Sequence, residues 1–196
     1  MGRVLLVVAS ACLITALGTG LAAGQVNLQS EAEASSTSSS DVFMFGTQTA
    51  VRPGSSTLTR SVGGISLTIN TSRLTPNAAH TLWWVVFNQP HRCSTIPCSA
   101  SDFPGNGGNP AINVSLFWAT GNVADANGLA TFAAHTAPGE IEGEVGFGAG
   151  LTNPLGAEVH VIIRDHGLVI DLLGQLLQLN ACNPTCKNVQ AVIHLQ

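Results

Sequence analysis

Residues 73–93, RLTPNAAHTLWWVVFNQPHRC, contain the clearest strand of the chain. Thr75-Pro76-Asn77 is typical of a turn, because proline fixes φ and asparagine tolerates unusual backbone angles. The run that follows, 79–88, is rich in the aromatic and β-branched residues that strands favour. Successive side chains on a strand point to opposite faces. One of Trp83 and Trp84 therefore faces the core, and the other faces outward or a covering loop.

The rest of the chain repeats this pattern of short strand-like runs between turn residues. The predicted strands are 42–49, 57–62, 65–71, 79–88, 113–119, 129–135, 158–164 and 189–195. Turns are indicated at 52–54 (RPG), at 63–64 (GG) and at 126–128 (ANG), the last of which predicts a hairpin. About eight such strands predict an all-β fold, a Greek-key antiparallel β-sandwich or a flattened barrel.

Residues 168–179, LVIDLLGQLLQL, have a different pattern. Their apolar side chains recur at helical spacing, at Val169, Leu172, Leu173, Leu176 and Leu177. The spacing predicts one short helix before the last strand, although Gly174 weakens it. Such a helix either caps one end of the sandwich or offers a docking surface to a partner protein or a membrane.

The first 24 residues are typical of a secretory signal peptide, with Arg3, an apolar run at 4–17 and small residues at 22–24. Export would place the mature protein in the periplasm or outside the cell. Ala9-Ser10-Ala11-Cys12 offers the alternative of a lipid anchor, but apolar residues continue past Cys12. After the predicted signal peptide, no segment is long and apolar enough to be a transmembrane helix.

Residues 25–40, QVNLQSEAEASSTSSS, have few large apolar side chains and are predicted to be a flexible tether. Residues 41–196 are then expected to form a single domain. Loss of Arg3 with the signal peptide leaves six basic residues (seven minus one) against eleven acidic ones, a net charge of −5 with neutral histidines. So few cations cannot neutralise a run of phosphates, which excludes nucleic-acid binding.

Four cysteines follow the predicted signal peptide, at Cys93, Cys98, Cys182 and Cys186. An even number in an exported chain predicts two disulfides, and the spacing leaves all three connectivities open. The alternative is a zinc site with four thiolate ligands, which an oxidising compartment disfavours.

Several motifs occur in the order found in copper–zinc superoxide dismutases and the related chordin-type domains. Leu74-Thr75-Pro76 resembles the turn before the strand that carries copper ligands, and Cys93 is similar to a structural loop cysteine of that family. Residues 121–130 (GNVADANGLA), 156–162 and 186–195 resemble its later segments. The resemblance implies a β-sandwich of the same layout. It also implies a disulfide between the 89–111 loop and the segment that opens the last strand, while the local pairs remain an alternative.

The residues at the family's metal-ligand positions are different in this chain. By the resemblance these positions are occupied by Leu82, Trp84, Leu116, Ala119 and Ile162. Aliphatic and indole side chains do not supply ligands for copper or zinc. We therefore expect no cofactor, no catalytic residues of this type and no superoxide dismutase activity. Instead the resemblance implies that Leu82, Trp84, Leu116 and Ile162 form an apolar seat for the 89–111 loop.

The histidines offer other candidate ligands. Alternation places His80 on the strand face of Trp84, and His160 on the strand face of Arg164. If these strands are neighbours, His80, His160 and Arg164 could converge on an anion or a metal. His166 is a third candidate metal ligand, and Trp84 and Arg164 are candidates for a binding surface. The structural alternative is that each histidine is solvated or bonds to the backbone.

The sequence thus favours a secreted, non-catalytic β-sandwich with a binding or structural role. One alternative is a metal-binding or divergent redox protein that uses His80, His160 or His166. Another is a module that docks a protein partner through the 168–179 helix.

Overall fold

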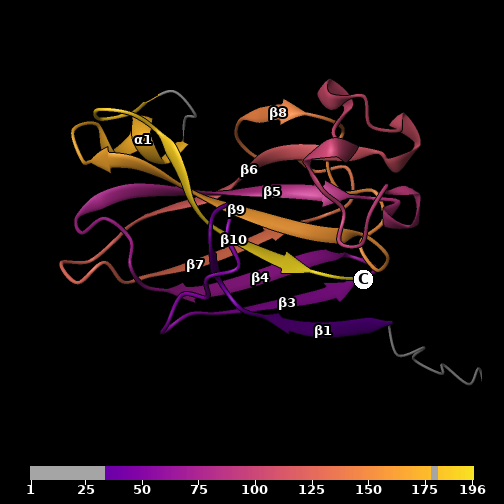
Figure 1. The fold of residues 1–196 in the computed structure, drawn as a ribbon, viewed down its shortest axis with the longest axis horizontal. Coiled ribbons are helices and arrows are strands. Elements are labelled where there is room, and N and C mark those ends of the chain that lie inside the picture. The colour runs from indigo at the N-terminus through magenta and orange to yellow at the C-terminus, as the bar shows by residue number, and fades with distance from the viewer. Residues whose placement is uncertain (1–33, 178–180) are drawn as a thin grey trace, which may run out of the picture. The chain divides into compact units, whose positions relative to one another are not determined.

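The computed structural model describes residues 34–177 and 181–196, which form two packed antiparallel sheets (Figure 1). In spatial order, the four-stranded sheet contains β1 (Ser35–Ser40), β3 (Ser55–Ser61), β4 (Gly64–Thr71) and β7 (Ala130–Thr136). The six-stranded sheet contains β2 (Phe43–Met44), β10 (Lys187–His194), β9 (Glu158–Leu168), β5 (Ala78–Phe87), β6 (Val114–Val123) and β8 (Val145–Phe147). The α-helix α1 (Leu172–Leu177) precedes β10. The predicted all-β sandwich with one short helix before the last strand is confirmed.

The chain passes between the sheets by Greek-key connections. After the antiparallel strands β5 and β6 the chain returns to the other sheet, where β7 pairs with β4. It then crosses again, so that β9 pairs with β5. These returns place β5 at the centre of the six-stranded sheet, between β9 and β6.

The main core lies between the sheets. Burial alternates along β3 and β4, as expected for strands with one solvated face. From β5 the side chains of Leu82, Trp84 and Val86 point into this core. Every residue of β5 is buried, because the opposite face of the strand is covered as well. Burial of one such large side chain contributes about 1.5–3 kcal/mol.

A loop rich in proline and glycine covers one end of that opposite face. It contains the 3-10 helices η1 (Pro90–Arg92), η2 (Ala100–Asp102), η3 (Pro104–Asn106) and η4 (Pro110–Ile112). The loop packs on Val85 and Phe87, and also on Leu116 and Ile162. The predicted seat is confirmed for Leu116 and Ile162. It is wrong for Leu82 and Trp84, because alternation along β5 turns them toward the other sheet.

The predicted tether is partly ordered. Residues 35–40 form β1, which pairs with β3 along its whole length. The prediction considered only apolar burial, whereas an edge strand also gains backbone hydrogen bonds, and Ser38 contacts the buried His194. The predicted signal peptide, 1–24, and tether residues 25–33 lie outside the described residues. Among the residues that are described, no helix has the length and hydropathy needed to cross a membrane.

The predicted helix at 168–179 is shorter in the structure. β9 continues to Leu168, and α1 has only six residues. Gly167, with φ at +81°, lets the strand pass so close to Asn183 that a Cβ atom would collide with its carbonyl oxygen. Residues 169–171 then cross from strand to helix, where the Asp171 carboxylate accepts a hydrogen bond from the Gly174 N–H. Residues 178 and 179 of the predicted helix lie outside the described residues.

Both disulfides are local, Cys93–Cys98 and Cys182–Cys186. The long-range bond implied by the resemblance is therefore wrong. Cys98 contacts Glu158 at the start of β9, whereas Cys186 contacts His166 near its end. Eight residues of strand separate these contacts by about 26 Å. A disulfide needs Cα atoms within about 7 Å.

Candidate functional site

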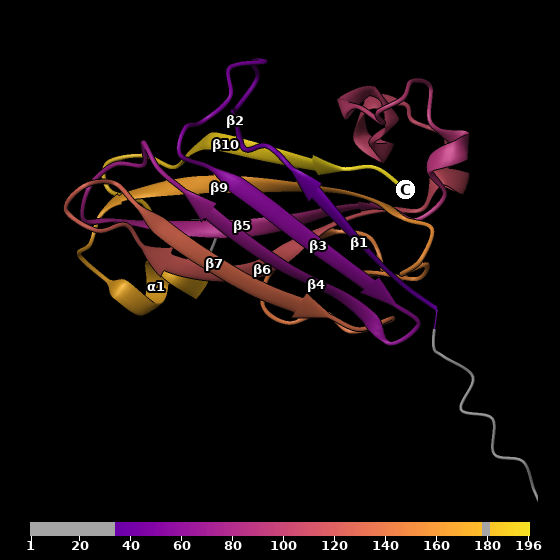
Figure 2. The ribbon, with the colours of Figure 1, turned by 90° about the horizontal axis from the view of Figure 1, so that it is seen from below.

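The face of the six-stranded sheet that points away from the other sheet, here called the outer face, carries the candidate site. Figures 1 and 2 place its two covers at opposite ends of β5: the loop with the 3-10 helices at one end and α1 at the other. The loop end is closed by aromatic packing, with the Phe87 and Phe103 rings 5.9 Å apart and those of Phe103 and Phe147 5.5 Å apart. The α1 end instead combines buried polar groups with exposed apolar ones.

A chain of hydrogen bonds runs beneath α1. The indole Nε1 of Trp83 donates to Thr81 Oγ1 at 2.8 Å, and this oxygen lies 2.7 Å from His166 Nε2. His166 Nδ1 lies 2.9 Å from the carbonyl oxygen of Ala181. A carbonyl only accepts, so Nδ1 carries the proton and Nε2 accepts from the Thr81 hydroxyl. Burial lowers the pKa of His166, which favours this neutral ring.

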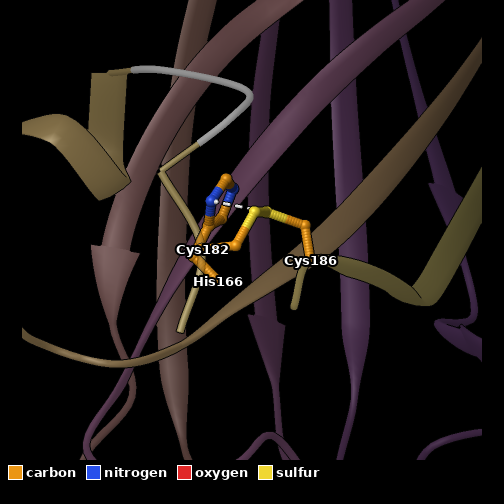
Figure 3. A group of neighbouring side chains, drawn as sticks. All are labelled: His166, Cys182 and Cys186. Carbon is orange, nitrogen blue, oxygen red and sulfur yellow. Dashed lines mark hydrogen bonds between the residues drawn. A yellow bond between two sulfur atoms is a disulfide. The ribbon is translucent and has the colours of Figure 1, made fainter. Parts of the chain in front are cut away.

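The Cys182–Cys186 disulfide lies against the same ring (Figure 3). Cys186 Sγ is 3.4 Å from His166 Nδ1. The ligand atoms of His166, Cys182 and Cys186 all lie within 4.8 Å of one another. Cys93, Cys98 and Asp102 form a second such group, but the Asp102 carboxylate already accepts hydrogen bonds from the Ser94 and Ser99 N–H groups.

Gln175 fixes the segment that follows β9. Its side chain is fully buried, and its Oε1 accepts from the N–H groups of Ile170 at 2.8 Å and Asp171 at 3.1 Å. Its Nε2 donates to the carbonyl oxygens of His166 at 3.1 Å and Leu168 at 3.0 Å. One amide thus holds both ends of the crossing from strand to helix.

The side chains around this fixed backbone are apolar and exposed. We call them the apolar ridge: Leu168, Val169, Ile170, Leu172, Leu173 and Leu177. Their exposed fractions range from 39% at Val169 to 72% at Ile170. Contiguous exposed apolar side chains of this kind mark interaction sites. The ridge segment 168–177 contains a single charged residue, Asp171, which caps α1.

His80 lies on the other side of the sheet. It is fully buried, and its Nδ1 lies 3.0 Å from the Ala78 carbonyl oxygen. Its Nε2 is 3.7 Å from Asp165 Oδ2, which accepts a hydrogen bond from Thr75 Oγ1 at 2.5 Å. Burial alone would raise the pKa of Asp165. The contacts with His80 and Thr75, and the hydrogen bond from the Gly167 N–H, outweigh burial and lower this pKa.

His160 anchors the loop end of the outer face. Its Nε2 lies 2.5 Å from Glu158 Oε1, which also accepts from the Cys98 N–H at 2.7 Å. Six residues of β9 separate His160 from His166, about 20 Å along a strand. His80, by contrast, faces the opposite side of the sheet from His160 and Arg164. The predicted convergence of these three residues is therefore wrong.

The two residues proposed for a binding surface have different surroundings. Trp84 is 1% exposed in the core between the sheets and cannot contact a partner there. Arg164 is half-buried and alternates with Ile162 and His166 on the outer face. Its Nε has no hydrogen-bond partner among the described residues. It lies within electrostatic range of His166, whose pKa it helps to lower after the larger effect of burial.

A buried polar link that the sequence did not predict joins the two sheets. His194 of β10 lies with Nε2 2.8 Å from Ser56 Oγ and with Nδ1 3.0 Å from Ser38 Oγ. Burial, and then the charge of Arg60, lower the pKa of His194 to about 4. Although a serine–histidine contact can activate a nucleophile, Ser56 is 1% exposed and no substrate can reach it. The link is structural.

A pocket of about 780 Å³ lies elsewhere, beside Asn70, Asn122 and Thr131. Its polar groups bond to one another. Thr131 Oγ1 donates to Asn70 Oδ1, and Asn122 Nδ2 donates to the Thr131 carbonyl oxygen. Because these groups already have partners, the pocket is a weaker candidate than the α1 end of the outer face.

Comparison of the chain with protein-family models, curated proteins and solved structures finds no match. The residues that sequence reasoning missed at the site are Thr81 and Gln175. Gln175 had a detectable signal, since it is a polar residue within an apolar segment. The contact between Thr81 and His166 depends on strand pairing, which composition does not reveal.

Proposed function

We propose that this protein is an exported, non-catalytic β-sandwich protein that binds a partner protein through the apolar ridge. The observation that carries the proposal is the exposure of six large aliphatic side chains on a backbone that Gln175 holds in place. Exposed apolar surface is unfavourable in water. Its retention on a rigid segment is typical of a binding surface.

Rigidity favours binding because ordering a flexible segment would cost free energy on association. The Trp118 indole adds to it, donating to the Leu176 carbonyl oxygen at 2.8 Å. The segment therefore presents its side chains without first having to fold.

The charge of the ridge favours a protein over a membrane. Segments that bind anionic lipid surfaces carry lysine and arginine beside their apolar face. The ridge segment has neither, and its one charge is the Asp171 carboxylate. A protein with an uncharged apolar groove is the complementary partner.

Export is supported by the two disulfides, which persist in oxidising compartments. We also propose that the fold is a distant relative of the superoxide dismutase layout. The Greek-key sandwich supports this relationship, while the local disulfides depart from it. The burial of Ser56, which contacts His194, closes that serine–histidine pair to a substrate and supports a non-catalytic role.

The test compares the double variant Ile170→Ser/Leu173→Ser with the control Ile96→Ser. Ile96 is 86% exposed but lies in the loop at the other end of the sheet. A partner captured from the envelope or medium of the source cells would be purified and its affinity measured by calorimetry. Removal of two apolar contacts, together worth about 3 kcal/mol, should weaken binding about 100-fold. The control should bind like the wild type.

Two further measurements discriminate among occupants. Sedimentation analysis would reveal a second copy of the chain on the ridge, and flotation with anionic vesicles would reveal a lipid surface. The proposal is wrong if the wild type self-associates or binds vesicles and the double variant does not. It is also wrong if the double variant binds the purified partner as tightly as the control does.

A further inference from the structure

We infer that His166, Cys182 and Cys186 bind a zinc-class metal ion when the Cys182–Cys186 disulfide is reduced. This site is independent of the partner proposed for the ridge. Thiolate and imidazole donors together select borderline-soft ions such as Zn²⁺.

The positions of the donors already suit such an ion. Their ligand atoms lie within 4.8 Å of one another in the oxidised protein. In a tetrahedral zinc site, bond lengths of about 2.0–2.3 Å place neighbouring ligand atoms about 3.5–3.8 Å apart. Once the sulfur–sulfur bond is broken, small side-chain rotations are enough to reach this geometry. With three protein ligands, solvent completes the coordination.

The hydrogen-bond chain beneath the site supplies the support that a metal-bound histidine requires. Ligation through Nδ1 moves the ring proton to Nε2, which then donates to Thr81 Oγ1. Thr81 Oγ1 lies 2.7 Å away and is itself held by the Trp83 indole. A hydroxyl oxygen can accept from both donors. Such outer partners fix the tautomer and the orientation of a ligating ring.

Access distinguishes this disulfide from the other one. Cys182 and Cys186 are half-buried, and Pro184 and Thr185 between them are exposed. In the other disulfide Cys93 is half-buried, but Cys98 is 3% exposed within the 89–111 loop. An ion can therefore approach both cysteines of the Cys182–Cys186 pair, but only one cysteine of the other pair.

The chemistry balances with a dithiol as reductant. Two electrons and two protons convert the disulfide into two thiols, and the dithiol becomes a disulfide. Binding of the ion then displaces both thiol protons to solvent and leaves two thiolates. His166 stays neutral and only exchanges its tautomer.

The experiment uses the mature chain with Co²⁺ as a spectroscopic probe and Zn²⁺ as a competitor. After reduction, we expect one Co²⁺ per chain with thiolate-to-cobalt absorption, displaced by Zn²⁺. The oxidised protein should show no such absorption. Thr81→Val removes the outer acceptor and should weaken affinity about 10–100-fold. Cys93→Ser/Cys98→Ser is the control and should retain the site.

Cys182→Ser/Cys186→Ser should abolish the absorption. If that variant does not fold, alkylation of the reduced wild type gives the answer: Zn²⁺ should protect Cys182 and Cys186 but not Cys93. The inference is overturned if cobalt binding survives the loss of Cys182 and Cys186, if it disappears in the control, or if Zn²⁺ protects neither cysteine.

Discussion

A fall in pH below neutral should destabilise this protein through His194. The His194 ring is 1% exposed, and its folded pKa is lowered to about 4. In the unfolded chain a histidine titrates near about 6.5. The unfolded state therefore binds more protons between these values, so stability is lost as the pH falls through this window.

The magnitude follows from the two pKa values. At pH 7.5 both states are nearly unprotonated at this ring. At pH 4.5 the unfolded ring is charged and the folded ring is mostly neutral, which costs about 2.5 kcal/mol of unfolding free energy. Asp165, whose folded pKa is also lowered, contributes stability that is lost only below its unfolded pKa of about 3.9. His166 acts in the same direction as His194.

Urea unfolding at pH 7.5 and pH 4.5 measures this difference for the wild type, for His194→Gln and for the control His91→Gln. His91 is exposed in the loop. The His194 variant should be less stable at pH 7.5, because it loses the contacts of the ring with Ser38 and Ser56. Because Gln cannot titrate, the variant should lose about 2.5 kcal/mol less than the wild type on acidification. The control should match the wild type. An equal loss in the His194 variant and the wild type would refute the reasoning.

Two further predictions concern the pinned segments. Gln175→Ala removes the acceptor of the Ile170 and Asp171 N–H groups and one donor to each of the His166 and Leu168 carbonyl oxygens. It should cost about 2–3 kcal/mol, measured by thermal melting against Gln48→Ala, whose side chain is exposed. Equal melting of the two variants would contradict the role assigned to Gln175. Cys93→Ser/Cys98→Ser opens a ring with a sequence separation of five and should cost about 2 kcal/mol in urea unfolding, and a negligible change would show that the loop is held by its aromatic packing alone.

Strand positions were largely predictable because alternation and turn residues are local signals. The central strand was predicted at 79–88 and lies at Ala78–Phe87. β1 was missed because its serines carry no apolar signal; its stability comes from pairing with β3 and from the contact between Ser38 and His194. Those partners are distant in sequence, so no local window contains them.

The site was less predictable for a related reason. Which side of a sheet a histidine faces follows from alternation, but which neighbour it meets depends on register. His80 and His166 lie on adjacent strands yet on opposite sides of one sheet, so the histidines could not be grouped from their spacing. Disulfide connectivity depended likewise on which end of β9 each cysteine pair packs against, which the resemblance represented wrongly.

The apolar ridge and the segment closed by the Cys182–Cys186 disulfide are both held by the end of β9, through different hydrogen bonds. Gln175 holds the ridge through backbone groups of residues 166–171, and none of these bonds involves a sulfur atom. The segment closed by the disulfide contacts the same strand through the Asn183 N–H, which donates to the His166 carbonyl oxygen at 2.8 Å. Opening the disulfide therefore removes a covalent restraint on residues 182–186 while leaving the bonds that order the ridge. We therefore expect partner binding on the apolar ridge and metal binding at His166, Cys182 and Cys186 to be independent of each other.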